Sequence, residues 1–131
     1  MHPTGRLIIG GAALALLAAC NSNDSNGNSN PPPTAITINL VSSPVPAFQP
    51  VVDTIAVGGT VTWQWDAGLH DVTSFSVAGS PTFTDVPDHT GPPPTPPQTI
   101  LAAAGTYHFF CSNHGTNLCS PGDMCGVIVA Q

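Results

Sequence analysis

Short β-branched segments, each bounded by Gly or Pro, recur from residue 34 to the end of the chain. The 131 residues include 15 Pro and 13 Gly but no Glu and only one Lys or Arg. Residues that favour helices at exposed positions are therefore nearly absent, whereas Val, Ile and Thr favour the pleated surface of a sheet. The sequence predicts an all-β fold of short strands joined by turns.

Alternation of apolar and polar residues locates the strands. In the segment TVTWQW, residues 60–65, the side chains of Val61, Trp63 and Trp65 share one face, which we expect to be the core. Further strands are expected at 34–40, 51–57, 70–77, 99–102, 106–111 and 125–130. Residues 78–98 contain DHTGPPPTPPQ and are predicted to form a long loop, because Pro cannot donate to a central strand ladder. Seven or eight strands of this kind fit a Greek-key β-sandwich over residues 34–131.

The first 20 residues have the layout of an export signal. Arg6 precedes an apolar run, residues 7–19, that is too short to span a bilayer comfortably. The run ends in LAAC at Cys20, which resembles the bacterial lipobox, in which the Cys is acylated and becomes the new N-terminus. The resemblance implies a signal peptide over 1–19 and an exported protein, lipid-anchored at the periplasmic face of the bacterial cell envelope. Asn21, in place of Asp after the Cys, favours the outer membrane.

Residues 20–33 are the predicted tether between lipid and domain. The segment NSNDSNGNSNPPP, residues 21–33, has no hydrophobic side chain and cannot bury apolar area to offset its chain entropy.

Loss of the signal peptide also removes Arg6, the only Lys or Arg, and leaves seven Asp. Nucleic acid is excluded as a partner because no cation remains to neutralise phosphates. A partner protein with a basic docking surface fits this charge.

Three cysteines remain once Cys20 carries lipid, which is an odd number for an oxidising compartment. Cys119 and Cys125 flank SPGDM, whose Pro and Gly favour a turn that brings the two sulfurs within bonding reach. We therefore expect a disulfide between them.

Cys111 ends the strand 106–111 and is followed three residues later by His114. Alone, this Cys-x-x-His spacing is a weak indication of a metal site.

His70 and Met124 strengthen the indication. His70 begins the strand 70–77, and Met124 is the only Met besides residue 1. Two imidazoles, one thiolate and one weak thioether are the donors of a trigonal copper site with an axial Met. Sulfur stabilises Cu(I) and imidazole accepts Cu(II), so such a site can change oxidation state with little rearrangement.

Four segments resemble the cupredoxins of the plastocyanin and azurin type. They are VGGTVTWQW (57–65), HDV (70–72), GTYHFFCSNH (105–114) and MCGVIV (124–129), and they follow the family's order over most of the predicted domain. The resemblance implies a Greek-key β-sandwich that binds one type 1 copper ion. It also implies the copper ligands, which are His70, Cys111, His114 and Met124.

The sequence departs from the family pattern at two places. Met124 follows His114 by ten residues, a longer spacing than is usual in the family. If the longer loop swings Met124 away, the axial position is empty or takes a backbone oxygen or water; a Cys119–Cys125 bridge would hold Met124 in place. Asp71 replaces the Asn that usually ties the two ligand loops together. We expect Asp71 to accept a hydrogen bond from Ser112 or a backbone N–H and to favour Cu(II).

The remaining histidines receive ordinary structural roles. His108 alternates with Tyr107 and Phe109 and is expected to face outward from the sandwich. His89 lies in the proline-rich segment and is expected to be solvated.

The leading interpretation is a membrane-tethered copper protein that carries single electrons between redox partners such as a c-type cytochrome. The sequence has no paired-carboxylate set and no Ser-His-Asp arrangement, so we expect neither an enzyme nor a small-molecule substrate. One alternative is a protein for copper sequestration or delivery. Another is a non-blue copper or zinc centre with an open coordination position. A two-copper site of the CuA type is disfavoured, because it needs two closely spaced cysteine ligands.

Overall fold

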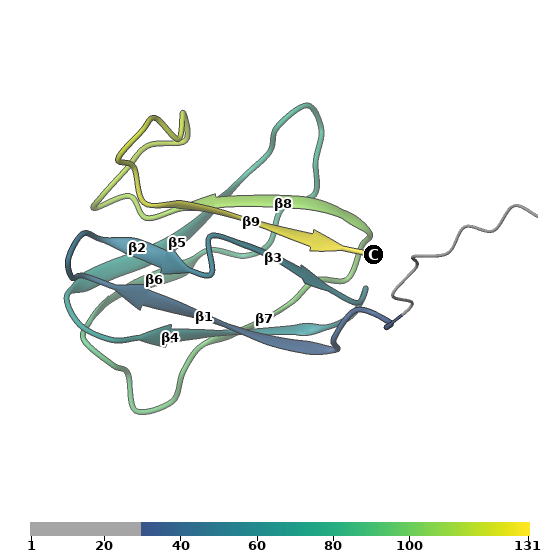
Figure 1. Ribbon diagram of the computed structural model, residues 1–131, viewed down its shortest axis with the longest axis horizontal. Helices are drawn as coiled ribbons and strands as arrows, with labels where there is room; N and C mark the ends of the chain where they lie inside the picture. The colour runs from purple at the N-terminus through teal and green to yellow at the C-terminus, as the bar shows by residue number, and fades with distance from the viewer. Residues whose placement is uncertain (1–29) are drawn as a thin grey trace, which may run out of the picture.

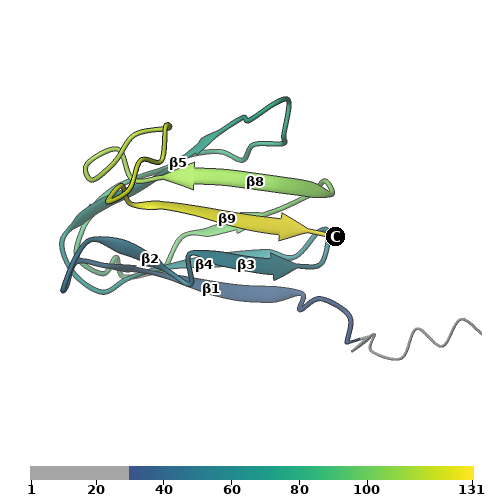
Figure 2. The ribbon, with the colours of Figure 1, turned by 45° about the horizontal axis from the view of Figure 1, so that its top comes forward.

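The computed structural model describes residues 30–131, which form two β-sheets packed face to face (Figures 1 and 2). The predicted signal peptide, the lipidated Cys20 and most of the tether lie outside these residues. Within the described range, no helix has the length and apolar character needed to cross a membrane. The predicted all-β sandwich is confirmed.

Nine strands make up the two sheets. In sequence order they are β1 (Ala35–Val41), β2 (Ala47–Gln49), β3 (Val52–Ile55), β4 (Thr60–Trp65), β5 (Leu69–Phe75), β6 (Val86–Thr90), β7 (Gln98–Ile100), β8 (Gly105–Phe110) and β9 (Cys125–Ala130). One sheet has the order β2-β1-β4-β7 and the other β3-β9-β8-β5-β6. β1 runs parallel to β4, and β3 runs parallel to β9; all other pairs are antiparallel.

Two strands were not predicted from the sequence. β2 is only three residues long, and β6 lies inside the segment 78–98, where the prediction of a continuous loop is wrong. β6 is the edge strand of its sheet, a position at which Pro87 is tolerated because one side of the strand has no ladder partner. The expectation that His89 is solvated is also wrong. His89 pairs with His70 across β5 and β6, is half-buried, and places its ring edge-on to Trp65, with 5.2 Å between centroids.

Alternation along β4 builds the centre of the core, as predicted. Trp63 and Trp65 are 0% and 1% exposed. Each indole N–H has a partner, because Trp63 Nε1 donates to Thr99 Oγ1 (2.8 Å) and Trp65 Nε1 donates to the carbonyl of His70 (3.2 Å). The second contact joins the core directly to the strand that carries a predicted metal ligand.

Phe109 on β8 links the two sheets. Its ring packs edge-to-face on Phe48 (4.8 Å) and on Trp63 (5.1 Å) and is fully buried. On its other side lies Gly126 of β9, paired with Phe109 in register. A Cβ at position 126 would overlap two ring carbons of Phe109. Glycine here lets the aromatic ring reach the centre of the sandwich.

Gly126→Ala should therefore destabilise the protein by about 1–3 kcal/mol, although Ala is otherwise better than Gly in a strand. Urea unfolding followed by circular dichroism measures this loss. Ile100→Ala, at an exposed β7 position, is the control and should change stability little. In a Phe109→Leu background the added cost of Gly126→Ala should shrink, because the ring carbons that clash are gone. An equal cost in both backgrounds would contradict the explanation.

Candidate metal centre

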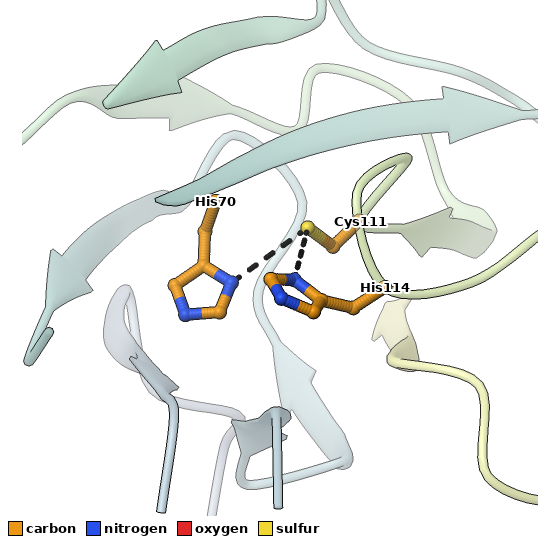
Figure 3. A group of neighbouring side chains, drawn as sticks. All are labelled: His70, Cys111 and His114. Atoms are coloured by element: carbon orange, nitrogen blue, oxygen red, sulfur yellow. Dashed lines mark hydrogen bonds between the residues drawn. The ribbon is translucent and has the colours of Figure 1, made fainter. Parts of the chain in front are cut away.

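His70, Cys111 and His114 converge at one end of the sandwich (Figure 3). One ligand atom from each lies within 4.8 Å of the others. Cys111 Sγ is 3.7 Å from His70 Nδ1 and 3.5 Å from His114 Nδ1. His70 and Cys111 are fully buried, and His114 is half-buried. Among the residues that the structure describes, this is the only such group of three or more His, Cys, Asp or Glu side chains.

Antiparallel pairing brings these side chains together. β5 runs antiparallel to β8, so His70 near the start of β5 lies beside Cys111, which directly follows β8. The chain then turns, because the N–H of His114 donates to the carbonyl of Cys111 at 3.1 Å. His70 and Cys111, which are 41 positions apart in the sequence, thus meet through regular strand pairing. His114 joins them through the local turn that follows Cys111.

Hydrogen bonding fixes which nitrogen of His70 is free. Ser42 Oγ lies 2.9 Å from His70 Nε2 and 2.7 Å from the carbonyl oxygen of Ala67. The hydroxyl has one proton, which goes to the carbonyl, so Ser42 accepts the N–H of His70 Nε2. Nδ1 is then unprotonated and points its lone pair toward Cys111. Gly68 allows this approach, since its φ is +84° and a Cβ there would overlap Ser42 Oγ.

The donor spacing fits a single metal ion. Metal bonds of about 2.3 Å to sulfur and about 2.0 Å to nitrogen, at tetrahedral or trigonal angles, place the two donors roughly 3.5–3.7 Å apart. The two Sγ–Nδ1 distances are 3.5 and 3.7 Å. Both sulfur–nitrogen separations therefore match those of donors on one metal ion. The distances alone suit zinc as well as copper, so the fourth residue matters.

Met124 is buried beside this group, with 1% exposure. Its carbonyl accepts the N–H of Cys111 (2.9 Å), and its own N–H donates to the carbonyl of His114 (3.0 Å). The longer loop therefore returns the backbone of Met124 to the site. A thioether is a soft, weak donor that suits copper rather than zinc. That Met124 supplies the axial ligand stays a prediction.

Asp71 ties β5 to the segment after Cys111, as expected for this position. Its carboxylate accepts hydrogen bonds from the N–H (2.6 Å) and hydroxyl (2.7 Å) of Ser112. Thr73, two residues along the same strand, donates a third at 2.9 Å. Burial raises the pKa of Asp71, but these bonds, led by those from Ser112, outweigh it and leave the pKa below its usual value. Asp71 is therefore ionised and cannot donate a hydrogen bond.

Burial also acts on the two most enclosed donors. It lowers the pKa of His70, helped by the nearby His114, and so favours the neutral imidazole that a metal needs. It raises the pKa of the Cys111 thiol. Because the metal ligand is the thiolate, metal binding has to displace this proton.

The disulfide Cys119–Cys125 that the spacing predicts joins the segment 112–124, here called the ligand loop, to the first residue of β9. The Cα atoms of the two cysteines are 5.8 Å apart. Leu118, at the tip, is 81% exposed. Figure 2 shows the loop leaving the sandwich at the end where β8 finishes and β9 begins. The disulfide lies outside the three-donor group, so Cys111 is left as the only free cysteine of the described residues.

Two residues at the site were not found from the sequence. Thr73 has the strand spacing that places it on the same face as Asp71, so period-two alternation was a usable signal. Ser42 directly follows β1, and no local pattern relates it to His70, which lies 28 residues further on. His108 lies on the face opposite Tyr107, half-buried against Phe75, and takes no part in the centre.

Solved structures share this fold. A variant of amicyanin in its reduced Cu(I) form superposes with a TM-score of 0.54 at 21% identity, over 74% of this chain and 82% of that one. A purple cupredoxin from Nitrosopumilus maritimus gives a TM-score of 0.56 at 22% identity, over 72% and 98% of the two chains. A copper-containing nitrite reductase from Thermus scotoductus SA-01 gives 0.57 at 24% identity, over 78% of this chain but only 23% of that chain.

No family model and no curated protein sequence matches the chain. The structural likeness, at these identities, establishes the fold. The chain has the cupredoxin fold, as the sequence resemblance implied, and its His-Cys-His group lies beside a buried Met.

Asp71→Ala should destabilise the protein by about 2–4 kcal/mol, because it leaves the hydrogen-bond donors of Ser112 and Thr73 without their charged acceptor. Asp71→Asn keeps an oxygen acceptor and should cost less. Denaturant unfolding of the metal-free protein measures both. Asp53→Ala is the matched control, since Asp53 carries the same charge but accepts only the N–H of the adjacent Thr54. A loss for Asp71→Ala no larger than for Asp53→Ala would show that Asp71 does not join the two segments.

Proposed function

We propose that this protein binds one type 1 copper ion through His70, Cys111, His114 and Met124 and carries single electrons between redox partners. The observation that carries the proposal is the preformed group of two imidazole nitrogens and one buried thiol sulfur. The buried Met124 lies beside it, and its backbone is hydrogen-bonded to the backbone of Cys111 and of His114. Copper, when bound there, supplies the Cu(II)/Cu(I) couple.

The burial of the donors supports outer-sphere electron transfer rather than catalysis on a bound substrate. Cys111, His70 and Met124 are at most 1% exposed, and His114 alone is partly accessible. A substrate needs an open coordination position that it can reach. The ring edge of His114 instead offers a short route for electrons to the surface. One structural relative is a nitrite reductase, so the carrier role without catalysis is part of the proposal.

The fixed surroundings of the donors suit fast electron transfer. Strand pairing, the Ser42 hydrogen bond and the Asp71 contacts hold the ligand-bearing backbone before any metal binds. Residues whose positions are fixed in this way cannot rearrange much between Cu(II) and Cu(I). Low rearrangement keeps the barrier to electron transfer small.

The charge of the chain indicates the kind of partner. The described residues contain no Lys or Arg, and the whole chain has a formal charge of −6. A redox protein with a basic docking surface, such as a c-type cytochrome, is attracted by such a charge. The export signal and Cys20 lipobox add to the proposal that the carrier works on a lipid anchor at the periplasmic face of the bacterial envelope, with Asn21 favouring the outer membrane.

Copper sequestration or delivery and a zinc or non-blue copper centre are the competing functions. Delivery favours exposed, exchangeable donors, whereas three of the four donor residues here are fully buried. A zinc centre would use the three-donor group with an open fourth position. Both differ from an electron carrier in the spectrum of the loaded protein.

Addition of Cu(II) to residues 34–131 should produce one equivalent of an intense visible thiolate-to-copper band that bleaches on reduction and returns on oxidation. Cys111→Ser should abolish the band, because it removes the sulfur from which charge is transferred. His108→Ala is the matched control for loss of a histidine outside the site and should leave the band unchanged. A colourless Cu(II) complex, or tighter binding of Zn(II) than of copper, would contradict the proposal.

A further inference from the structure

The half-buried carboxylate of Asp123 gathers hydrogen bonds from the first part of the ligand loop. Its Oδ2 accepts the N–H (3.3 Å) and the hydroxyl (3.0 Å) of Thr116 and the N–H of Ser120 (3.0 Å). The N–H of Asp123 in turn donates to the carbonyl of Ser120 at 2.9 Å. One oxygen atom therefore connects two separate points of the loop to the residue directly before Met124.

These contacts continue into the metal centre. The N–H of Met124 donates to the carbonyl of His114 at 3.0 Å. Gly115 directly follows His114. A Cβ added at Gly115 would be only 3.0 Å from Asp123 Cβ and 3.0 Å from the nitrogen of Met124. The outgoing and returning limbs of the loop are thus in close contact next to His114. A loss of order at Asp123 is transmitted to Met124 through adjacent backbone.

The disulfide does not make these contacts redundant. Cys119 and Cys125 join the tip of the loop to the start of β9, on the far side of Met124 from Asp123. Thr116, which precedes the bridge, is bound to the returning limb mainly through Asp123. Met124, whose backbone is hydrogen-bonded to Cys111 and His114, is therefore flanked by the disulfide on one side and by the contacts of the Asp123 carboxylate on the other.

We propose that Asp123 is a positioning residue that holds Met124 at the axial side of the copper centre and so helps to set its reduction potential. The inference rests on the proposed function. The axial ligand of such a site tunes its reduction potential, so a change in how closely the thioether is held should change that potential. The carboxylate orders the irregular segment directly before Met124 and so adds to the two backbone hydrogen bonds that hold Met124 itself.

Two substitutions separate the charge of Asp123 from its hydrogen bonds. Asp123→Asn keeps an oxygen acceptor and removes the charge, so it should raise the potential, because a nearby anion favours Cu(II). Asp123→Ala removes both. We expect both the potential and the visible spectrum of Asp123→Ala to differ from those of Asp123→Asn and to shift toward those of Met124→Ala. Equal potentials and spectra for the two variants would overturn the proposal.

A double-mutant comparison tests whether the effect passes through Met124. In a Met124→Ala background, the difference between Asp123→Ala and Asp123→Asn should vanish. A difference that persists unchanged would show that Asp123 acts by another route. If Asp123→Ala binds no copper, Thr116→Val, which keeps the charge and removes one donor, replaces it. A change in potential that disappears in the Met124→Ala background supports the proposal, and an unchanged potential overturns it.

A copper-free measurement separates this proposal from the proposed function. In the metal-free protein, amide hydrogen exchange at Met124 should become about tenfold faster in Asp123→Ala, while exchange at Val61 in the core stays the same. Unchanged Met124 exchange overturns the positioning role. A wild-type protein that lacks the visible copper band contradicts the proposed function instead, whatever the exchange rates show.

Discussion

The backbone hydrogen bonds between Cys111, His114 and Met124 are the interaction on which the candidate centre depends. The N–H of Cys111 donates to Met124, and the N–H of Met124 donates to His114. The bond between Cys111 and Met124 extends the pairing of β8 with β9 by one step beyond the last paired residues, Phe110 and Cys125. The two limbs of the ligand loop therefore start close together, and the contacts of Asp123 join them just beyond this point.

This arrangement explains how the site accommodates a long loop. Extra residues between His114 and Met124 can project from the sandwich, because both ends are held by the sheet and do not need to move apart (Figure 2). The projecting part has few buried side chains, and Leu118 is largely exposed. It is ordered instead by the disulfide and by polar contacts to Asp123.

The sequence predicted the parts of the fold that depend on local pattern. Alternation in 60–65 located β4 and its two buried Trp, and turn residues between Cys119 and Cys125 indicated their bridge. β6 was missed because proline content argues against a strand only where the strand is central, and edge position is set by the whole topology. A sequence pattern does not show which strand will be an edge.

The same limit applies to the site. Local spacing related Cys111 to His114, but the approach of His70 required the pairing of β5 with β8. Ser42 was missed for a related reason, because its contact with His70 joins the turn after β1 to β5 of the other sheet and follows no strand periodicity. Its hydroxyl nevertheless determines which ring nitrogen is free. The identity of the donors was readable from the sequence, whereas their protonation depends on contacts between distant segments.

The charge balance around the site would bear on the potential of a copper ion bound as proposed. Cu(II) with one thiolate and two neutral imidazoles would carry a net charge of about +1, which the ionised Asp71 would offset. Reduction then leaves a net negative charge in a buried region, and the described residues contain no Lys or Arg to compensate it. Charges close to a buried site are weakly screened, so Asp71 would oppose reduction of a copper ion bound there. The soft sulfur donors and the apolar surroundings would favour Cu(I) instead, and the potential would be set by the balance between these two effects.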